Sequence, residues 1–194
     1  MKKGRLEAFS DGVLAIIITV MILEIKVPIG SEFINLKPVI PIFLSYVLSF
    51  IYIAIYWNNH HHMMHTVKQV SGDILWANLH LLFWLSLIPF VTGWIGENHF
   101  TKVPMIFYGI ILLMSAIAYY ILQTRIIMKH GADSILSKAI GKDLKGKISP
   151  VLYLIAIGSC WISPWIAGII YIFVAFIWLV PDKRIEIIFK NEEL

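Results

Sequence analysis

Long apolar runs, separated by short polar segments, dominate the pattern of the chain. An α-helix rises about 1.5 Å per residue, so a run of roughly 20 apolar residues can cross the hydrocarbon core of a bilayer. The pattern therefore predicts a series of membrane-spanning helices, and a compact polar cluster at residues 5–11 precedes the first. The apolar runs cover residues 9–25, 39–57, 74–94, 103–122 and 148–180.

The last apolar run is too long for one span. Ser163 and Pro164 divide it, because proline and the residue before it resist helix continuation. We therefore expect an all-α membrane protein with six transmembrane helices in one channel domain that covers residues 1–194. The fifth helix, residues 149–162, is short for a span, so it starts earlier, tilts little or lies partly buried in protein.

The composition is that of a multi-pass membrane protein. Of the 194 residues, 59% are hydrophobic and 14% charged, with a mean hydropathy of +0.80; a soluble domain is about half apolar and about a quarter charged. The single cysteine, Cys160, excludes an intramolecular disulfide framework. The sequence contains neither a Walker A motif nor a TVGYG loop, which argues against an ATP-driven pump and against a carbonyl-lined potassium filter.

The basic residues predict the orientation in the membrane. With the N-terminus in the cytoplasm, 13 lysines and arginines fall on the inner side and only Lys26, Lys37 and Lys102 on the outer side. An excess of positive charge marks the cytoplasmic side, so we expect both termini and the polar loop at residues 123–147 to be cytoplasmic. The formal net charge of +4 is then explained by the basic residues that set the membrane orientation, and we expect no nucleic-acid partner.

One face of the first predicted helix carries the smaller side chains. Positions i, i+3, i+4 and i+7 align along a helix. The side chains at these positions are apolar, except for one that carries a hydroxyl group. We expect this face to line an ion pathway. Its members are Gly12, Ile16, Thr19, Val20 and Leu23.

Three polar groups lie at one depth, near the cytoplasmic ends of the first three predicted helices. Polar groups in a membrane are costly unless they are paired. We therefore expect a hydrogen-bonded belt that holds the first helix against the second and third, with a bidentate pair between Arg5 and Asp11; the alternative is a set of separate interfacial residues solvated by headgroups. The groups are Arg5, Ser10 and Asp11, then Trp57, Asn58, Asn59 and His60, then Trp76, Asn78 and His80.

Four of the seven histidines stand in the segment WNNHHHMMH, residues 57–65. A metal site would need several inward-facing ligands from different helices, and neither an HExxH motif nor a paired carboxylate accompanies this run. We therefore favour an interfacial polar stretch with one buried, hydrogen-bonded histidine over a His-cluster metalloenzyme. The pattern leaves open which of His60, His61 and His62 is buried.

Several short motifs occur together. RLEAFSD opens the first apolar helix, a WxxH ends the second span, and LWANL followed by PF lies on the third. With these motifs the chain resembles the transmembrane protein 175 family, the endosomal and lysosomal potassium channels of animals and their bacterial homologues. The resemblance implies the one-repeat bacterial form, a homotetramer in which the first helix of each copy lines a central pore.

The resemblance also implies roles for individual residues. It places a hydrophobic constriction, acting as filter or gate, at Ile16, and further pore layers at Thr19, Val20 and Leu23. It assigns Arg5, Ser10, Asp11, His60 and Asn78 to a structural network, to which the belt described above adds Trp57.

We expect a potassium-permeable cation channel in the cell membrane, with the lipid bilayer and three further copies as its partners. Potassium and other monovalent cations would flow passively, and selection would arise where partly dehydrated ions pass narrow aliphatic rings, helped by the Thr19 hydroxyl. We expect no enzyme activity, no cofactor and no resident metal ion. The alternative is a proton- or cation-coupled secondary transporter that uses Asp11 and His60 as a relay. A broken helix or an inverted repeat would mark it, and neither is evident in the sequence.

Overall fold

The protein is built of helices throughout the part of the chain that the structure describes. The computed structural model describes residues 2–131, 133–140 and 143–179; four of the inner-side basic residues, at 142, 183, 184 and 190, and the end of the last apolar run lie outside these ranges. The prediction of an all-helical chain with several apolar helices is confirmed. The elements are α1 (Lys3–Leu23), η1 (Phe33–Val39), α2 (Ile40–His65), α3 (Gly72–Ser86), α4 (Ile88–Glu97), α5 (Lys102–His130), α6 (Ile135–Ile140), α7 (Leu144–Ser159) and α8 (Pro164–Leu179).

Four helical segments of the described chain are long and apolar enough to cross a membrane. They are α1, η1 with α2, α3 with α4, and α5, and they correspond to the first four predicted spans. Helix α7 has 16 residues, and the described part of α8 also has 16. At about 1.5 Å per residue this is roughly 24 Å, less than the ~30 Å of a hydrocarbon core. The last two predicted spans therefore correspond to a hairpin of α7, which is short for a span, and α8, which is described only to Leu179.

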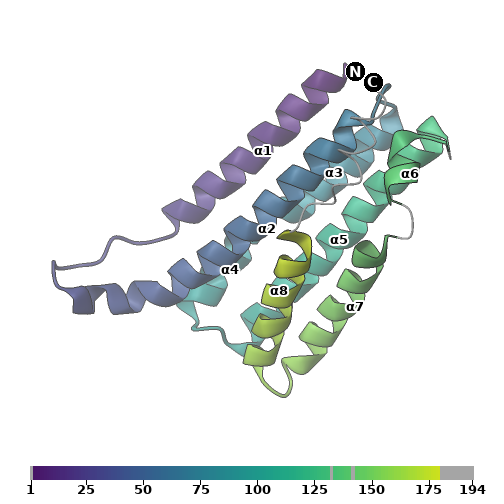
Figure 1. Ribbon diagram of the computed structural model, residues 1–194. Helices are drawn as coiled ribbons and strands as arrows, with labels where there is room; N and C mark the ends of the chain where they lie inside the picture. Colours follow the sequence, from purple (N-terminus) through teal and green to yellow (C-terminus); the bar gives the residue numbers. More distant parts are fainter. Residues whose placement is uncertain (1, 132, 141–142, 180–194) are drawn as a thin grey trace.

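The third span is divided at Leu87 into α3 and α4, where the sequence pattern predicts one continuous helix. Pro89 is the cause, because its ring lacks an N–H donor and clashes with the carbonyl of Leu85 one turn earlier. A turn at Leu87 relieves the clash, and the Leu87 N–H still bonds to the carbonyl of Trp84 at 3.2 Å. Helix α4 continues along the course of α3 (Figure 1). The break is thus a proline kink within one span rather than the unwound segment expected of a transporter.

Helices α2 and α5 continue well beyond the ends that hydropathy predicts for them. The pattern places these ends near residues 57 and 122, whereas the helices reach His65 and His130. Apolar side chains mark only the part of a helix inside the bilayer, and backbone hydrogen bonds can carry the helix further. Helix α5 stops where Gly131 adopts a φ of 89°, a conformation that glycine reaches at little cost.

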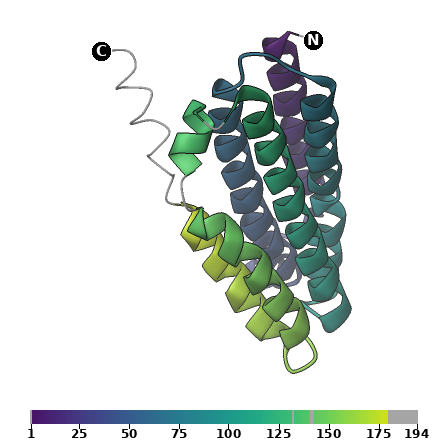
Figure 2. The ribbon, with the colours of Figure 1, turned by 90° about the vertical axis from the view of Figure 1, so that its right-hand side faces the viewer.

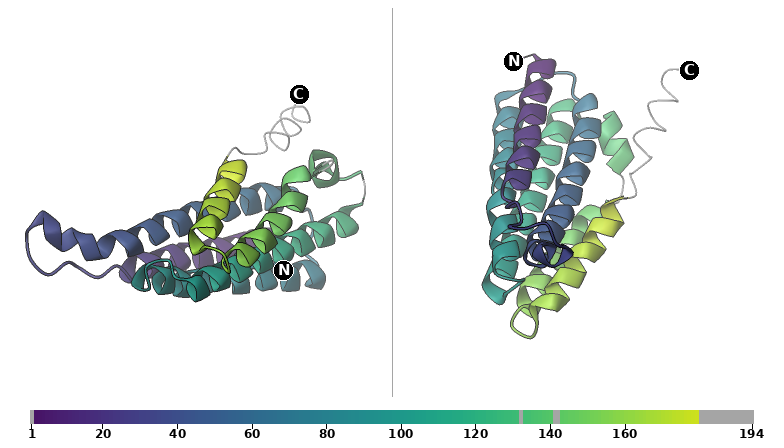
Figure 3. Two further views of the ribbon diagram at one scale, coloured as in Figure 1. Left: turned by 90° about the horizontal axis from the view of Figure 1, so that it is seen from below. Right: turned by 90° about the vertical axis from the view of Figure 1, so that its left-hand side faces the viewer.

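Helix α2 lies between two groups of helices (Figure 1). On one side α1 packs against α2, α3 and α4; on the other, α8 packs against α2, α5 and α7. Figure 2 and the right panel of Figure 3 show the long helices side by side, with the α7–α8 hairpin inclined across their flank. Helix α1 is therefore peripheral in the single chain, with one side uncovered.

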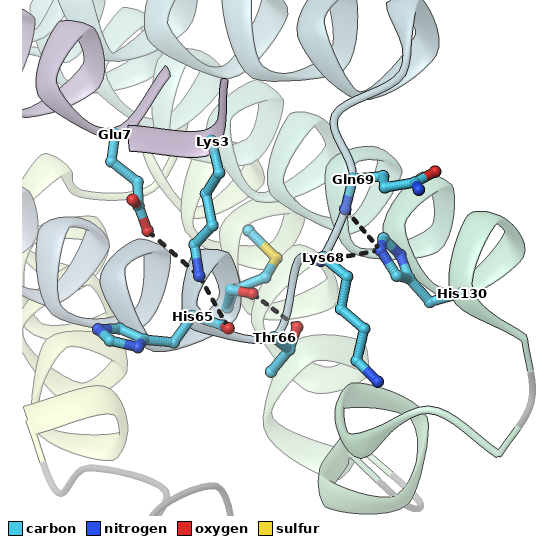
Figure 4. Close-up of polar contacts among 8 residues, drawn as sticks. Lys3, Glu7, His65, Thr66, Lys68, Gln69 and His130 are labelled. Carbon is cyan, nitrogen blue, oxygen red and sulfur yellow. Dashed lines mark hydrogen bonds and ion pairs between the residues drawn. The ribbon is translucent and has the colours of Figure 1, made fainter. Parts of the chain in front are cut away.

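Polar contacts join the helix ends at the predicted cytoplasmic end of the bundle (Figure 4). Lys3 Nζ donates to the carbonyl of His65 at 3.0 Å and lies 3.7 Å from Glu7 Oε1. His130 Nε2 accepts a hydrogen bond from the backbone N–H of Lys68 at 3.0 Å. These contacts tie the start of α1 to the end of α2, and the α2–α3 connection to the end of α5.

Candidate pore face and polar network

Helix α1 presents two different faces. The buried face packs on the bundle, and its members follow helical spacing: Leu6, Ser10, Leu14, Ile17 and Met21. The opposite face is uncovered, with Ile16 63%, Val20 39% and Leu23 76% exposed, and Thr19 is exposed beside them. The four residues predicted to line a pore thus lie together on the surface of the single chain, facing away from the other helices.

The exposed face of α1 offers oxygen lone pairs at one level. Thr19 Oγ1 donates to the carbonyl of Ala15 at 2.9 Å, so the hydroxyl proton is engaged and the lone pairs remain free to face a cation. Ile16, Val20 and Leu23 contribute only hydrocarbon. In a single chain such a face can meet lipid or another copy of the protein; around an axis it would form aliphatic rings and one ring of hydroxyls.

A buried hydrogen-bonded network joins α1, α2 and α3. Ser10 Oγ donates to the carbonyl of Leu6 at 2.9 Å and accepts from Asn78 Nδ2 at 2.9 Å. Asn78 Oδ1 therefore faces His60 Nε2, 2.7 Å away, and because the amide oxygen can only accept, His60 carries its proton on Nε2. Ser10 and Asn78 are fully buried, and His60 is 3% exposed. Through Ser10, the network holds the buried face of α1 against Asn78 of α3, which in turn is bonded to His60 of α2.

Asp11 and Arg5 do not form the ion pair that the sequence suggested. Asp11 Oδ1 instead accepts a hydrogen bond from Trp57 Nε1 at 3.0 Å, in an exposed position. Among the described residues Arg5 has no ion pair and is exposed. The reason is helical geometry: residues six apart lie on different faces, whereas those three or four apart are neighbours. Asp11 and His60, the relay of the transporter alternative, likewise belong to separate contacts.

The histidine run divides into one buried residue and an outward stack. His60 is the histidine of the network, whereas the ring of His61 stacks on Trp57 at 6.0 Å between centroids and lies 4.6 Å from that of His65. No group of three or more His, Cys, Asp or Glu residues in the described chain could hold a metal ion. The structure thus places one histidine at the helix contacts and the rest of the run toward the surface.

A second buried polar cluster lies in the other half of the bundle and was missed in the sequence. Thr92 Oγ1 lies 2.7 Å from Ser49 Oγ, which lies 3.1 Å from the hydroxyl of Tyr108. Ser45 Oγ is 3.0 Å from the carbonyl of Thr92. The cluster joins α2, α4 and α5. Its signal was present, because Ser45 and Ser49 are four apart within an apolar run and so share one helix face.

Comparison with known proteins relates the chain to potassium channels. A family model described as "Endosomal/lysosomal potassium channel TMEM175" matches residues 5–89. A potassium channel of Chryseobacterium sp. (strain P1-3) is 59% identical over 186 residues, which cover 96% of this chain and 97% of that protein. A potassium channel of Chamaesiphon minutus (strain ATCC 27169 / PCC 6605) is 33% identical over 186 residues, which cover 84% of this chain and 87% of the relative.

The fold also matches a solved structure. The crystal structure of a lysosomal potassium-selective channel TMEM175 homolog from Chamaesiphon minutus superposes with a TM-score of 0.78 at 31% identity. The match covers 93% of this chain and 97% of the other. The similarity therefore extends well beyond the residues that the family model matches.

Proposed function

The chain belongs to the TMEM175 family of potassium channels, and from this membership we propose that α1 of each of four copies lines a central, potassium-permeable pore. Membership of this family makes the chain a multi-pass membrane channel rather than an enzyme, with K⁺ as the permeant ion and no cofactor. The proposal concerns how this chain builds its pore.

The exposed face of α1 carries the proposal. A helix on the flank of a bundle, held on its buried side by the Ser10–Asn78–His60 network, turns a continuous side toward its surroundings. In a tetramer about an axis along α1, four copies of this face would meet. Ile16 would then form a dry aliphatic ring, with Thr19, Val20 and Leu23 above it toward the outer side.

Selection in such a pore follows from hydration. A ring of isoleucines supplies no oxygen ligand, so an ion sheds part of its water to pass, and the ion with the looser hydration shell, potassium, loses less free energy than sodium. The Thr19 lone pairs, left free by the bond to Ala15, would partly replace the lost water one level away. A narrow aliphatic ring can also close by dewetting, which makes the same residue a gate.

The proposed membrane arrangement uses the whole chain as one channel domain. Six helices span the cell membrane, with α7 and α8 as the last two, and both termini are cytoplasmic. The charge bias supports the orientation, and the close match of nearly the whole chain to a solved channel supports including α7 and α8. The short length of α7 is compatible with a position packed against α5 and α8, where protein replaces lipid on one side.

Paired cysteine variants test whether α1 lines the pore. Leu23 and Ile22 are neighbours at one depth and both exposed in the single chain, at 76% and 45%, but point about 100° apart around the helix. In a Cys160→Ser background, a cationic thiol reagent applied to both sides of proteoliposomes should block potassium flux through Leu23→Cys and leave Ile22→Cys conducting. Equal block of both variants, or of neither despite labelling, would contradict the pore assignment.

A further inference from the structure

A deep apolar groove runs along α8, between this helix and the outer half of α2. Its volume is about 390 Å³. Side chains that line it are substantially exposed, including Leu44 at 53% on α2, and Ile169 at 67% and Phe176 at 65% on α8. Figure 1 shows α8 on the opposite side of α2 from α1. Helix α8, which forms one wall of the groove, therefore lies on the far side of α2 from the proposed pore axis.

The hydroxyl groups in the groove lining, those of Ser45, Tyr108 and Tyr171, are already bonded within the protein. Ser45 Oγ contacts the carbonyls of Ile42 and Thr92, the Tyr108 hydroxyl lies 3.1 Å from Ser49 Oγ, and the Tyr171 hydroxyl donates to the carbonyl of Met105 at 3.0 Å. None of these groups needs a partner from outside. A polar ligand or ion would gain nothing in the groove, whereas a hydrocarbon chain would fill it.

A lysine and the aromatic ring on which it packs lie close in sequence to Phe100 and Trp165, which line the outer end of the groove. Lys102 Nζ lies 4.8 Å from the ring centroid of Trp161, and Phe100 and Trp165, which line the groove, pack at 5.5 Å. In the described part of the chain Lys102 has no ion pair. Helices α5 and α8 both begin here, so their positive dipole ends add to the charge of the lysine. Exposed tryptophans are typical of the headgroup level.

We propose that this groove binds an anionic phospholipid of the outer leaflet, with one acyl chain along α8 and the phosphate at Lys102. The lining extends from Trp165 to Leu179, or about 21 Å along the helix, which exceeds the roughly 15 Å that one leaflet contributes to the hydrocarbon core. A helix from a second copy could cover the apolar lining, but it would leave Lys102 without an anion. The exposure of the groove to lipid rests on the proposed tetramer, in which α1 faces the pore axis. Lipid retention is measured without ion flux, so the lipid site and the pore assignment can fail separately.

Native mass spectrometry of the purified full-length protein tests the site with two probes, phosphatidylglycerol and phosphatidylcholine of identical acyl chains. Gly168→Phe should fill the groove, because Gly168 lines it and a Cβ added there meets only the terminal methyl of Met105, at 3.4 Å. Gly158→Phe, on α7 with open space around it, is the matched control. Lys102→Gln should remove the headgroup preference, with Lys37→Gln as its exposed outer control.

The expected result is a bound lipid, with phosphatidylglycerol preferred, that is lost in Gly168→Phe and kept in Gly158→Phe. Lys102→Gln should lower the preference for phosphatidylglycerol roughly fivefold, the equivalent of about 1 kcal/mol for one lysine near the surface, while Lys37→Gln leaves it unchanged. Full lipid retention in Gly168→Phe would overturn the proposal, and a changed oligomeric mass in that variant with unchanged lipid would show that the groove is a contact between copies. If Gly168→Phe does not fold, an unaltered preference in Lys102→Gln overturns the proposal by itself.

Discussion

Asn78→Ala tests the buried network that positions α1. The side chain of Asn78 makes two bonds, donating to Ser10 Oγ at 2.9 Å and accepting from His60 Nε2 at 2.7 Å. Ser10 keeps its bond to the Leu6 carbonyl in the variant, so it loses an accepted bond without leaving its own proton unpaired. His60, which is 3% exposed, loses the acceptor for its Nε2 proton while its side chain stays buried.

The expected loss of stability is about 2.6 kcal/mol. A buried donor left unsatisfied costs about 1–3 kcal/mol and a lost hydrogen bond about 0.5–1.5 kcal/mol. Interhelical hydrogen bonds in membrane proteins average only about 0.6 kcal/mol, because the chain unfolded in the membrane also finds partners. The unsatisfied donor of His60 contributes about 2 kcal/mol, the middle of its range. The accepted bond lost at Ser10 contributes about 0.6 kcal/mol, and the two together give about 2.6 kcal/mol.

Reversible unfolding in detergent with increasing dodecyl sulfate, followed by tryptophan fluorescence, measures this loss. The matched control is Asn98→Ala, because Asn98 Nδ2 donates to the Trp94 carbonyl of its own helix at 2.9 Å in an exposed position. Asn98→Ala should shift the free energy of unfolding by less than about 0.5 kcal/mol, as surface changes usually do. If Asn78→Ala is no more destabilising than Asn98→Ala, the network does not hold α1 in place.

Two further predictions concern the predicted cytoplasmic end and the topology. Asp11→Ala should cost less than about 1 kcal/mol in the same unfolding assay, because the bond from Trp57 is exposed; loss of assembly on size exclusion would instead reveal a buried partner for Asp11 between copies. In a Cys160→Ser background, Ser31→Cys should react with an impermeant thiol reagent in intact cells and Ser134→Cys should not, and the reverse pattern would invert the proposed orientation.

Hydropathy and proline positions were enough to locate the four long spans, because burial in a bilayer demands continuous apolar sequence. They were not enough to place the kink at Leu87. Pro89 lies inside a run that remains apolar on both sides, so hydropathy does not change there. The C-terminal ends of α2 and α5 were also not predicted correctly, since hydropathy indicates where a helix leaves the bilayer rather than where its last backbone hydrogen bond lies.

Which side chains of the polar network meet depends on their angular positions around the helices, and the sequence pattern specifies these positions only in part. Shared depth suggested that Ser10, His60 and Asn78 could meet, and the structure brings them together. The same reasoning paired Arg5 with Asp11, although a separation of six residues turns their side chains to different faces. The bond between Trp57 and Asp11 joins two helices, and its geometry follows from their packing, which no local pattern contains.

The central claim is that Ile16 forms the selective constriction of a pore lined by α1. Ile16→Asn, at a position 63% exposed in the single chain, should give a folded tetramer with raised conductance and a potassium-over-sodium preference that falls toward unity, because a polar ring lets ions keep their water. The same substitution at Ile17, which is 4% exposed against the bundle, should damage folding instead. Matched potassium and sodium flux from proteoliposomes measures the outcome. A well-folded Ile16→Asn channel with unchanged selectivity would contradict the account.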